Sequence, residues 1–251
     1  MITVARAAAK MSTKSLDRLV QARYADAIAQ GALLFTKSTV NLQPEQGVEF
    51  EVRYVPALAK KPSSKPREKQ ATKNFVNPFL PYDPRLHVKS LGDAHHLLLN
   101  KYCVVPHHLL ITTTEFKQQG EPLVESDFEA VLETTTNLSP PQIVFYNSGE
   151  ESGASQPHKH LQVLPMPSYF TEPPSQSIWH RSCPKPGSVC VSANLPFAHY
   201  GVCLDPNNIS AAALLLAYNS ALSDLTTVYG KDASYNMILT PDALMLFPRK
   251  N

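Results

Sequence analysis

The sequence lacks the features that mark several specialised classes of protein. Its 251 residues include four cysteines and no Cys-x-x-Cys pair, which excludes a disulfide-rich scaffold, a zinc ribbon and a thioredoxin-like motif. The longest apolar run, residues 211–217, is far shorter than the roughly 20 residues that cross a bilayer. We therefore expect no membrane partner and a reducing, intracellular setting.

An excess of charge of one sign is also missing. Lysine and arginine number 23 against 21 acidic residues, and a formal net charge of +2 is too mild to indicate a nucleic-acid surface. Charged residues make up 18% of the chain and hydrophobic ones 43%, a balance that favours a folded core over disorder. We expect one domain over residues 1–251 and no nucleic-acid partner.

The N-terminus has no sustained apolar stretch of the kind found in secretory signals. It carries arginine and alanine and no acidic residue before Asp17, so organelle targeting stays open beside the cytoplasmic location that we expect. Met11 could equally be an alternative start.

Hydrophobic periodicity and turn residues predict an α+β fold with a mainly antiparallel sheet, because strands outnumber helices and seldom alternate with them. Helices are predicted over residues 14–30, 126–136 and 211–230, with caps at Gly31, Ser126 and Ser210. Strands are predicted over residues 32–35, 48–55, 86–91, 96–105, 109–113, 142–146, 160–164, 197–204, 235–239 and 244–247. We predict a mobile basic loop over residues 60–77. Residues 165–196 are rich in proline, and we expect them to be irregular.

The densest chemical signal is the alternation of His158, His160 and Gln162. On a strand this spacing sends all three side chains to one face, where an ordinary core strand would carry Val, Ile or Leu. An imidazole can attack a phosphoryl centre and hold the group as a phosphoramidate. For this the attacking nitrogen must be unprotonated, so the other nitrogen must give its proton to a fixed acceptor, often a backbone carbonyl.

A loop of small residues precedes these histidines. Gly149 and Gly153 would let backbone N–H groups approach an anion closely, and Ser152 and Ser155 add hydroxyl donors. Such donors would stabilise the charge that develops on phosphate oxygens during substitution. The combination favours chemistry on a phosphate group.

Two other interpretations of the histidines remain open. They could be zinc ligands, with a third ligand from a cysteine or from His95, His96, His107 or His108, although Gln162 is a poor zinc ligand. They could also be core histidines whose hydrogen bonds are satisfied.

The run from Phe145 through Gln162 resembles the active-site signature of the diadenosine tetraphosphate (Ap4A) phosphorylases, also called ATP adenylyltransferases. These belong to the histidine-triad superfamily, in the branch of galactose-1-phosphate uridylyltransferase, where Gln replaces the last His. Residues 53–62, 98–112 and 234–240 are similar to the same family, and the likeness runs from about residue 15 to the end. It implies a histidine-triad-like fold.

The resemblance implies a reversible nucleotidyl transfer, in which Ap4A and phosphate give ATP and ADP through a covalent adenylyl-histidine. His160 would be the nucleophile, Gln162 would hydrogen-bond the transferred phosphate, and His158 would orient the site. The substrate-binding residues that it implies are Lys61, Asn100, Lys101, Asn147, Gly153, Ala154, Ser155 and Gln156.

Diadenosine polyphosphates, ATP, ADP and phosphate would be the small-molecule partners. The resemblance requires no obligatory cofactor and no metal site, although Mg²⁺ could accompany the substrate phosphates. The oligomeric state is not indicated.

Three alternatives to the phosphorolysis of Ap4A remain: hydrolysis of dinucleoside polyphosphates, phosphorolysis of adenylyl sulfate, and nucleotide binding without turnover. The last is motivated by a family segment rich in Asn, Ser, Gly and Met, which would follow the final hairpin and which we expect this chain to lack after Asn251.

Overall fold

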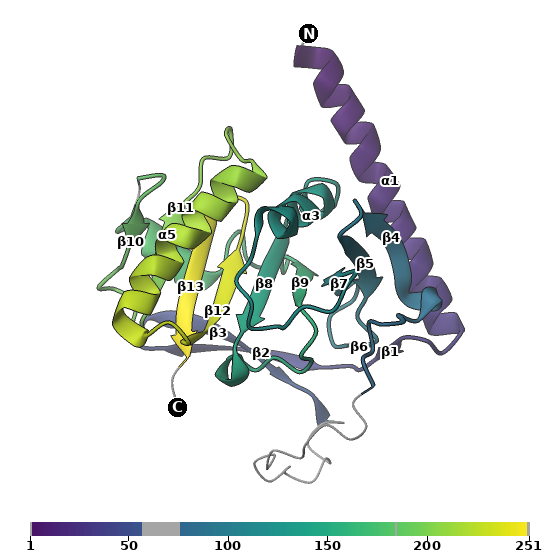
Figure 1. The fold of residues 1–251 in the computed structure, drawn as a ribbon, viewed down its shortest axis with the longest axis horizontal. Helices are drawn as coiled ribbons and strands as arrows, with labels where there is room; N and C mark the ends of the chain where they lie inside the picture. The colour runs from purple at the N-terminus through teal and green to yellow at the C-terminus, as the bar shows by residue number, and fades with distance from the viewer. Residues whose placement is uncertain (1, 57–75, 184, 250–251) are drawn as a thin grey trace.

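A computed structural model of the protein describes residues 2–56, 76–183 and 185–249, and for residues 2–14 it describes the backbone alone. Within those ranges a nine-stranded sheet dominates, in the order β10-β11-β13-β12-β8-β9-β7-β5-β4 (Figure 1). Its strands are β4 His87–Leu91, β5 His95–Leu99, β7 Leu109–Thr113, β8 Gln142–Ser148, β9 His160–Pro165, β10 Val189–Cys190, β11 Tyr200–Cys203, β12 Ser234–Leu239 and β13 Ala243–Arg249. Every neighbouring pair is antiparallel, which confirms the predicted α+β fold.

Helices and two small ribbons surround the sheet. The helices are α1 Ile2–Ala29, α3 Glu125–Thr135, α4 Pro174–His180 and α5 Ala211–Tyr229, with short 3₁₀ turns η1 Pro84–Leu86 and η2 Glu150–Ser152. The ribbons are β1 Leu34–Phe35 with β6 Tyr102–Cys103, which are parallel, and β2 Thr39–Glu45 with β3 Val48–Tyr54, which are antiparallel. In Figure 1, α3 and α5 lie side by side on one face of the sheet. No helix in the described parts of the chain is both long and apolar enough to span a membrane.

The sheet carries different clusters on its two faces because side chains alternate along each strand. Leu161 and Val163 of β9 enter the main core, which they share with Phe128 of α3 and with Tyr218 of α5. On the opposite face, Leu98 and Leu110 form a small cluster with Phe79, and α4 and β3 pack over the β11–β13 end. His160 and Gln162 alternate with the main-core residues of β9, so they belong to this second face.

Several predicted elements have different bounds in the structure. α1 begins at Ile2 rather than near residue 14, because its alanine-rich start favours a helix without the apolar periodicity on which the prediction relied. Strand β2 was not predicted, since all its residues are exposed and no core pattern marks it. The strand predicted over 96–105 ends at Leu99, where the Asn100 side chain accepts a hydrogen bond from the Tyr102 N–H (3.1 Å) and turns the chain.

Three further predictions need correction. Residues 165–196 contain α4, which begins at Pro174 and is too short to show periodicity, and strand β10, which pairs with β11 outside this segment. Cys183 and Cys190 form a disulfide with a Cα–Cα distance of 5.8 Å, where the sequence had predicted reduced thiols. The cap of α3 also differs: Val124 precedes the helix, and its N–H donates to the Asp127 carboxylate (2.8 Å).

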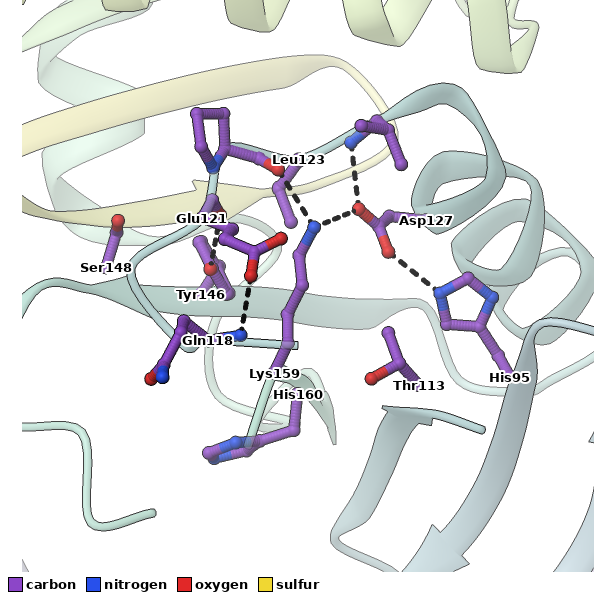
Figure 2. Close-up of polar contacts among 12 residues, drawn as sticks. His95, Thr113, Gln118, Glu121, Leu123, Asp127, Tyr146, Ser148, Lys159 and His160 are labelled. Atoms are coloured by element: carbon purple, nitrogen blue, oxygen red, sulfur yellow. Dashed lines mark hydrogen bonds and ion pairs between the residues drawn. The ribbon is translucent and has the colours of Figure 1, made fainter. Parts of the chain in front are cut away.

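A buried charge network joins Lys159, the residue before β9, to α3 on the helix side of the sheet (Figure 2). The Lys159 ammonium donates to the Asp127 carboxylate (2.7 Å) and to the Pro122 carbonyl (2.8 Å). His95 Nε2 lies 2.8 Å from the other Asp127 oxygen, and all three side chains are almost fully buried. Burial alone would raise the pKa of Asp127, but the bonds from His95 and the charge of Lys159 hold it below its usual value. The Asp127 carboxylate is therefore charged. Its ion pair with Lys159 holds in place the residue that lies between His158 and His160.

Replacing Lys159 by Met should lower the free energy of unfolding by about 3–5 kcal/mol, because it leaves the Asp127 charge buried without its cation. The matched control is Lys89→Met, which removes an exposed ion pair with Glu133 and should change it by about 0–1 kcal/mol. Urea unfolding of both variants measures the difference, and equal small losses would contradict a structural role for the network.

Candidate active site

The His160 side chain is held with one defined nitrogen unprotonated. Its Nδ1 lies 2.8 Å from the His158 carbonyl oxygen, which can only accept, so Nδ1 carries the proton. The lone pair therefore lies on Nε2. Burial lowers the pKa of His160 below its usual value, which keeps the ring neutral. This is the arrangement that attack on a phosphoryl group requires, with the carbonyl acceptor that the sequence argument anticipated.

His158 lies behind His160 and is fully buried. Its Nε2 is 3.0 Å from the Thr113 carbonyl oxygen, and its Nδ1 is 2.9 Å from the Asn77 amide nitrogen. Because the Thr113 carbonyl can only accept, Nε2 carries the proton. Nδ1 then accepts from the Asn77 amide nitrogen, while the Asn77 oxygen accepts from the Phe79 N–H (3.0 Å). Burial lowers the pKa of His158 as well. Both ring nitrogens are thus used to hold the residue whose carbonyl fixes His160.

Gln162 is oriented by a chain of two more side chains. His108 Nε2 donates to the Gln162 oxygen (3.0 Å), and His108 Nδ1 accepts from the Asn100 amide (3.1 Å). Burial lowers the pKa of His108 to about 4, so it stays neutral and keeps this tautomer. Because His108 holds the Gln162 oxygen, the Gln162 amide nitrogen points away from His108. There it can donate a hydrogen bond to an anion.

A cavity of about 850 Å³ opens onto these groups. The predicted site residues that line it are Asn100, Lys101, Ser155, Gln156, His160 and Gln162. Phe79, Leu98 and Leu110 add an apolar wall, and the Phe79 ring centroid lies 5.4 Å from that of His160. The cavity therefore joins a neutral imidazole, polar donors and one lysine to an apolar surface.

Four predicted residues that the structure describes do not line this cavity: His158, Asn147, Gly153 and Ala154. Gly153 and Ala154 lie in the loop beside it, Asn147 bonds to Asn236 of β12 (2.8 Å), and Lys61 lies outside the described residues, like most of the predicted basic loop. Asn77, the last residue of that predicted loop, contacts His158 instead.

The glycines of the loop differ in what they do. A Cβ on Gly149, which has φ +87°, would lie 2.3 Å from the Ser234 hydroxyl oxygen, so close packing against β12 requires this glycine. Gly153 has φ +82° and open space around its Cα, so only its backbone conformation favours glycine there. Packing against β12 therefore accounts for a glycine at 149, which does not line the cavity, and anion binding by its N–H stays a prediction.

Sequence reasoning missed Asn77, Thr113 and Asn236, and it considered His108 only as a zinc ligand. No sequence pattern near His158 indicates Asn77 or Thr113, because they lie 81 and 45 positions away from it in the chain. Asn236 lies within the stretch 234–240 that resembled the family, which was the available clue.

The zinc interpretation does not fit these contacts. Both nitrogens of His158 are hydrogen-bonded to protein atoms, and His95 bonds Asp127 on the other side of the sheet. Among the described residues, the His, Cys, Asp or Glu side chains placed to share a metal ion are Glu172, His180 and Asp242, and neither His158 nor His160 belongs to such a group.

Comparison with known families decides the identity of the chain. The model of the Ap4A phosphorylase N-terminal domain matches residues 6–177, and that of the ATP adenylyltransferase C-terminal domain matches residues 193–251. The chain belongs to the Ap4A phosphorylase family. Its nine-stranded sheet takes strands from both matched regions.

Relatives of this family member come from yeast. Diadenosine 5′,5‴-P1,P4-tetraphosphate phosphorylase 2 of Saccharomyces cerevisiae is 29% identical, over 96% of this chain and 82% of its own length. Protein APA1 of the same organism is 27% identical, over 92% of this chain and 78% of its own.

Solved structures give the same result. The crystal structure of yeast Ap4A phosphorylase Apa2 matches with a TM-score of 0.80 and 27% identity, covering 94% of this chain and 82% of that one. The structure of Apa2 in complex with Ap4A matches with a TM-score of 0.78 and 27% identity, covering 93% and 80%. The fold expected from the resemblance is therefore confirmed.

The hydrogen bonds predict opposite tautomers for the two histidines. We expect His160 in the Nδ1–H form and His158 in the Nε2–H form, both neutral at pH 6.5 because burial lowers their pKa values. Long-range ¹⁵N–¹H NMR spectra of histidine-labelled protein distinguish the two forms, with His158→Asn and His160→Asn variants to assign the signals. An Nε2–H form of His160 would contradict its assignment as a nucleophile.

Proposed function

We propose that this chain catalyses the phosphorolysis of Ap4A, in which phosphate converts Ap4A to ATP and ADP through an adenylyl group on His160. The observation that carries the proposal is the 2.8 Å bond from His160 Nδ1 to the His158 carbonyl, which leaves the Nε2 lone pair on a ring that lines the cavity. The yeast relatives named as Ap4A phosphorylases support the choice of substrate.

The first half-reaction is attack by His160 Nε2 on the α-phosphorus of Ap4A. A nitrogen–phosphorus bond forms, the bridging bond to the β-phosphate breaks, and ATP leaves. In the second half-reaction, an oxygen of inorganic phosphate attacks the same phosphorus, the bond to Nε2 breaks, and ADP leaves. The ring returns to its starting tautomer because the proton stays on Nδ1, which donates to the His158 carbonyl throughout.

The remaining residues of the cavity bind and orient the substrate in this scheme. Gln162 donates its amide to a non-bridging oxygen of the transferred phosphate, where negative charge develops. Lys101 supplies positive charge for the rest of the polyphosphate chain, and Ser155 and Gln156 offer further donors from the loop. The apolar wall around Phe79 suits a nucleobase.

This scheme assigns no step to a metal held by protein side chains. Mg²⁺ would be bound by the substrate phosphates, since the one carboxylate that lines the described part of the cavity, Asp83, is already paired with Arg85. Free nucleotides and phosphate, rather than nucleic acid, are the proposed partners. We propose a cytoplasmic location as well, because ATP, ADP and phosphate are abundant there.

Ion-exchange chromatography of products tests the reaction directly. Purified protein is mixed with Ap4A, with and without phosphate, and equal amounts of ATP and ADP should form only when phosphate is present. Two ADP, or AMP with ATP, in the absence of phosphate would make the protein a hydrolase. Nucleotide binding without product in either mixture would mean a binding protein.

A trapping experiment tests the nucleophile. Incubation with adenine-labelled Ap4A, followed by alkaline denaturation, should leave label on the wild-type chain as an acid-labile phosphoramidate. His160→Asn should bear none and should lose turnover, whereas His180→Asn, outside the cavity on α4, should behave as the wild type does. Label on the His160 variant would place the nucleophile elsewhere.

A further inference from the structure

The pairing between β8 and β9 stops just before the active site. Its last paired residues are Phe145 and Gln162. If the same register continued by two residues, Asn147 of β8 would pair with His160 of β9. These two residues are not paired with each other; they pair only with the strands on their other sides, β12 and β7. The strands diverge, and the loop that follows β8 contributes Ser155 and Gln156 to the cavity.

The side-chain amide of Gln119 fills the gap between the diverging strands. Its oxygen accepts from the His160 backbone N–H (2.8 Å), and its nitrogen donates to the His160 carbonyl (3.1 Å) and to the Asn147 carbonyl (2.8 Å). In an antiparallel strand the N–H and C=O of one residue point to the same side, so a single amide can bond both. Gln119 thus takes the place of a peptide unit inserted into the ladder.

Gln119 is itself held firmly. Its side chain is buried, its backbone N–H donates to the Pro157 carbonyl (2.8 Å), and its carbonyl accepts from the Tyr146 hydroxyl. The same hydroxyl bonds the Glu121 carbonyl (2.8 Å). Figure 2 shows Tyr146 beside this loop, whose Gln118 N–H is bonded to the Glu121 carboxylate (2.8 Å). The amide is therefore presented to His160 from a fixed loop.

We propose that Gln119 is a positioning residue for the nucleophile, an inference that rests on the proposed phosphorolysis. The ring of His160 is fixed by the His158 carbonyl, and its peptide is fixed by Gln119. Together these contacts determine where Nε2 lies and in which direction its lone pair points. Gln119 does not line the cavity, so it acts on the rate through His160 and not by touching the substrate.

Single-turnover kinetics of Gln119→Met and Gln118→Met test the proposal. Both replace a glutamine by an apolar side chain of similar length, but Gln118 is exposed. A displacement of about 1 Å in the nucleophile can cost on the order of 100-fold in rate. We expect the rate constant for adenylyl transfer to fall about 10- to 100-fold in Gln119→Met, with little change in KM, and to stay within about twofold of wild type in Gln118→Met.

The amplitude of the single turnover separates positioning from folding. A purely structural role would reduce the fraction of active molecules, and hence the amplitude, while the rate constant of the remaining molecules stayed unchanged. Full amplitude with an unchanged rate constant, or reduced amplitude alone, would overturn the proposal. If the wild type itself forms no product, the proposed function fails before Gln119 is tested.

Gln119→Glu provides a second, independent test through its pH profile. An ionised carboxylate can accept from the His160 N–H but cannot donate to either carbonyl, whereas a protonated one regains a donor. The rate of this variant relative to wild type should therefore rise as the pH falls from 8 to 6. This ratio remains measurable even if Gln119→Met does not fold, and a ratio that is independent of pH would overturn the proposal.

Discussion

The two-residue period of β9 is the constraint on which the rest of the site depends. Lys159, the residue before this strand, and Leu161 face the helices, while His160 and Gln162 face the cavity. A slip of one residue would exchange these sets, placing two polar groups in the core and a lysine in the cavity. The Lys159–Asp127 pair opposes such a slip, because it would separate two buried charges.

The chemistry of the site follows from burial combined with complete hydrogen bonding. His108, His158 and His160 are all held neutral by burial, and each has a fixed acceptor or donor that selects its tautomer. Neutral imidazoles suit a site that must accept a polyanion and still offer a lone pair. The cations that line the described part of the cavity are Lys101 and Arg85, and Arg85 is paired with Asp83.

Much of this arrangement was accessible from sequence. The alternation at 158–162 predicted one shared face, which the contacts of Phe79 with both His158 and His160 confirm. The hairpin of β12 and β13 and the Ser210 cap of α5 were also predicted, because turn and cap signals are local. The roles of the predicted substrate-binding residues remain predictions, and Lys61 lies outside the described part of the chain.

By itself, the sequence determined the fold class, the family and the face on which the histidines lie, since these follow from short-range periodicity and a contiguous signature. Only the tertiary structure decided which residues support them. Asn77 meets His158 across 81 positions, His108 meets Gln162 across 54, and Gln119 meets His160 across 41. Such pairs form because strand order and loop course bring distant backbone together, and no spacing within one segment encodes them.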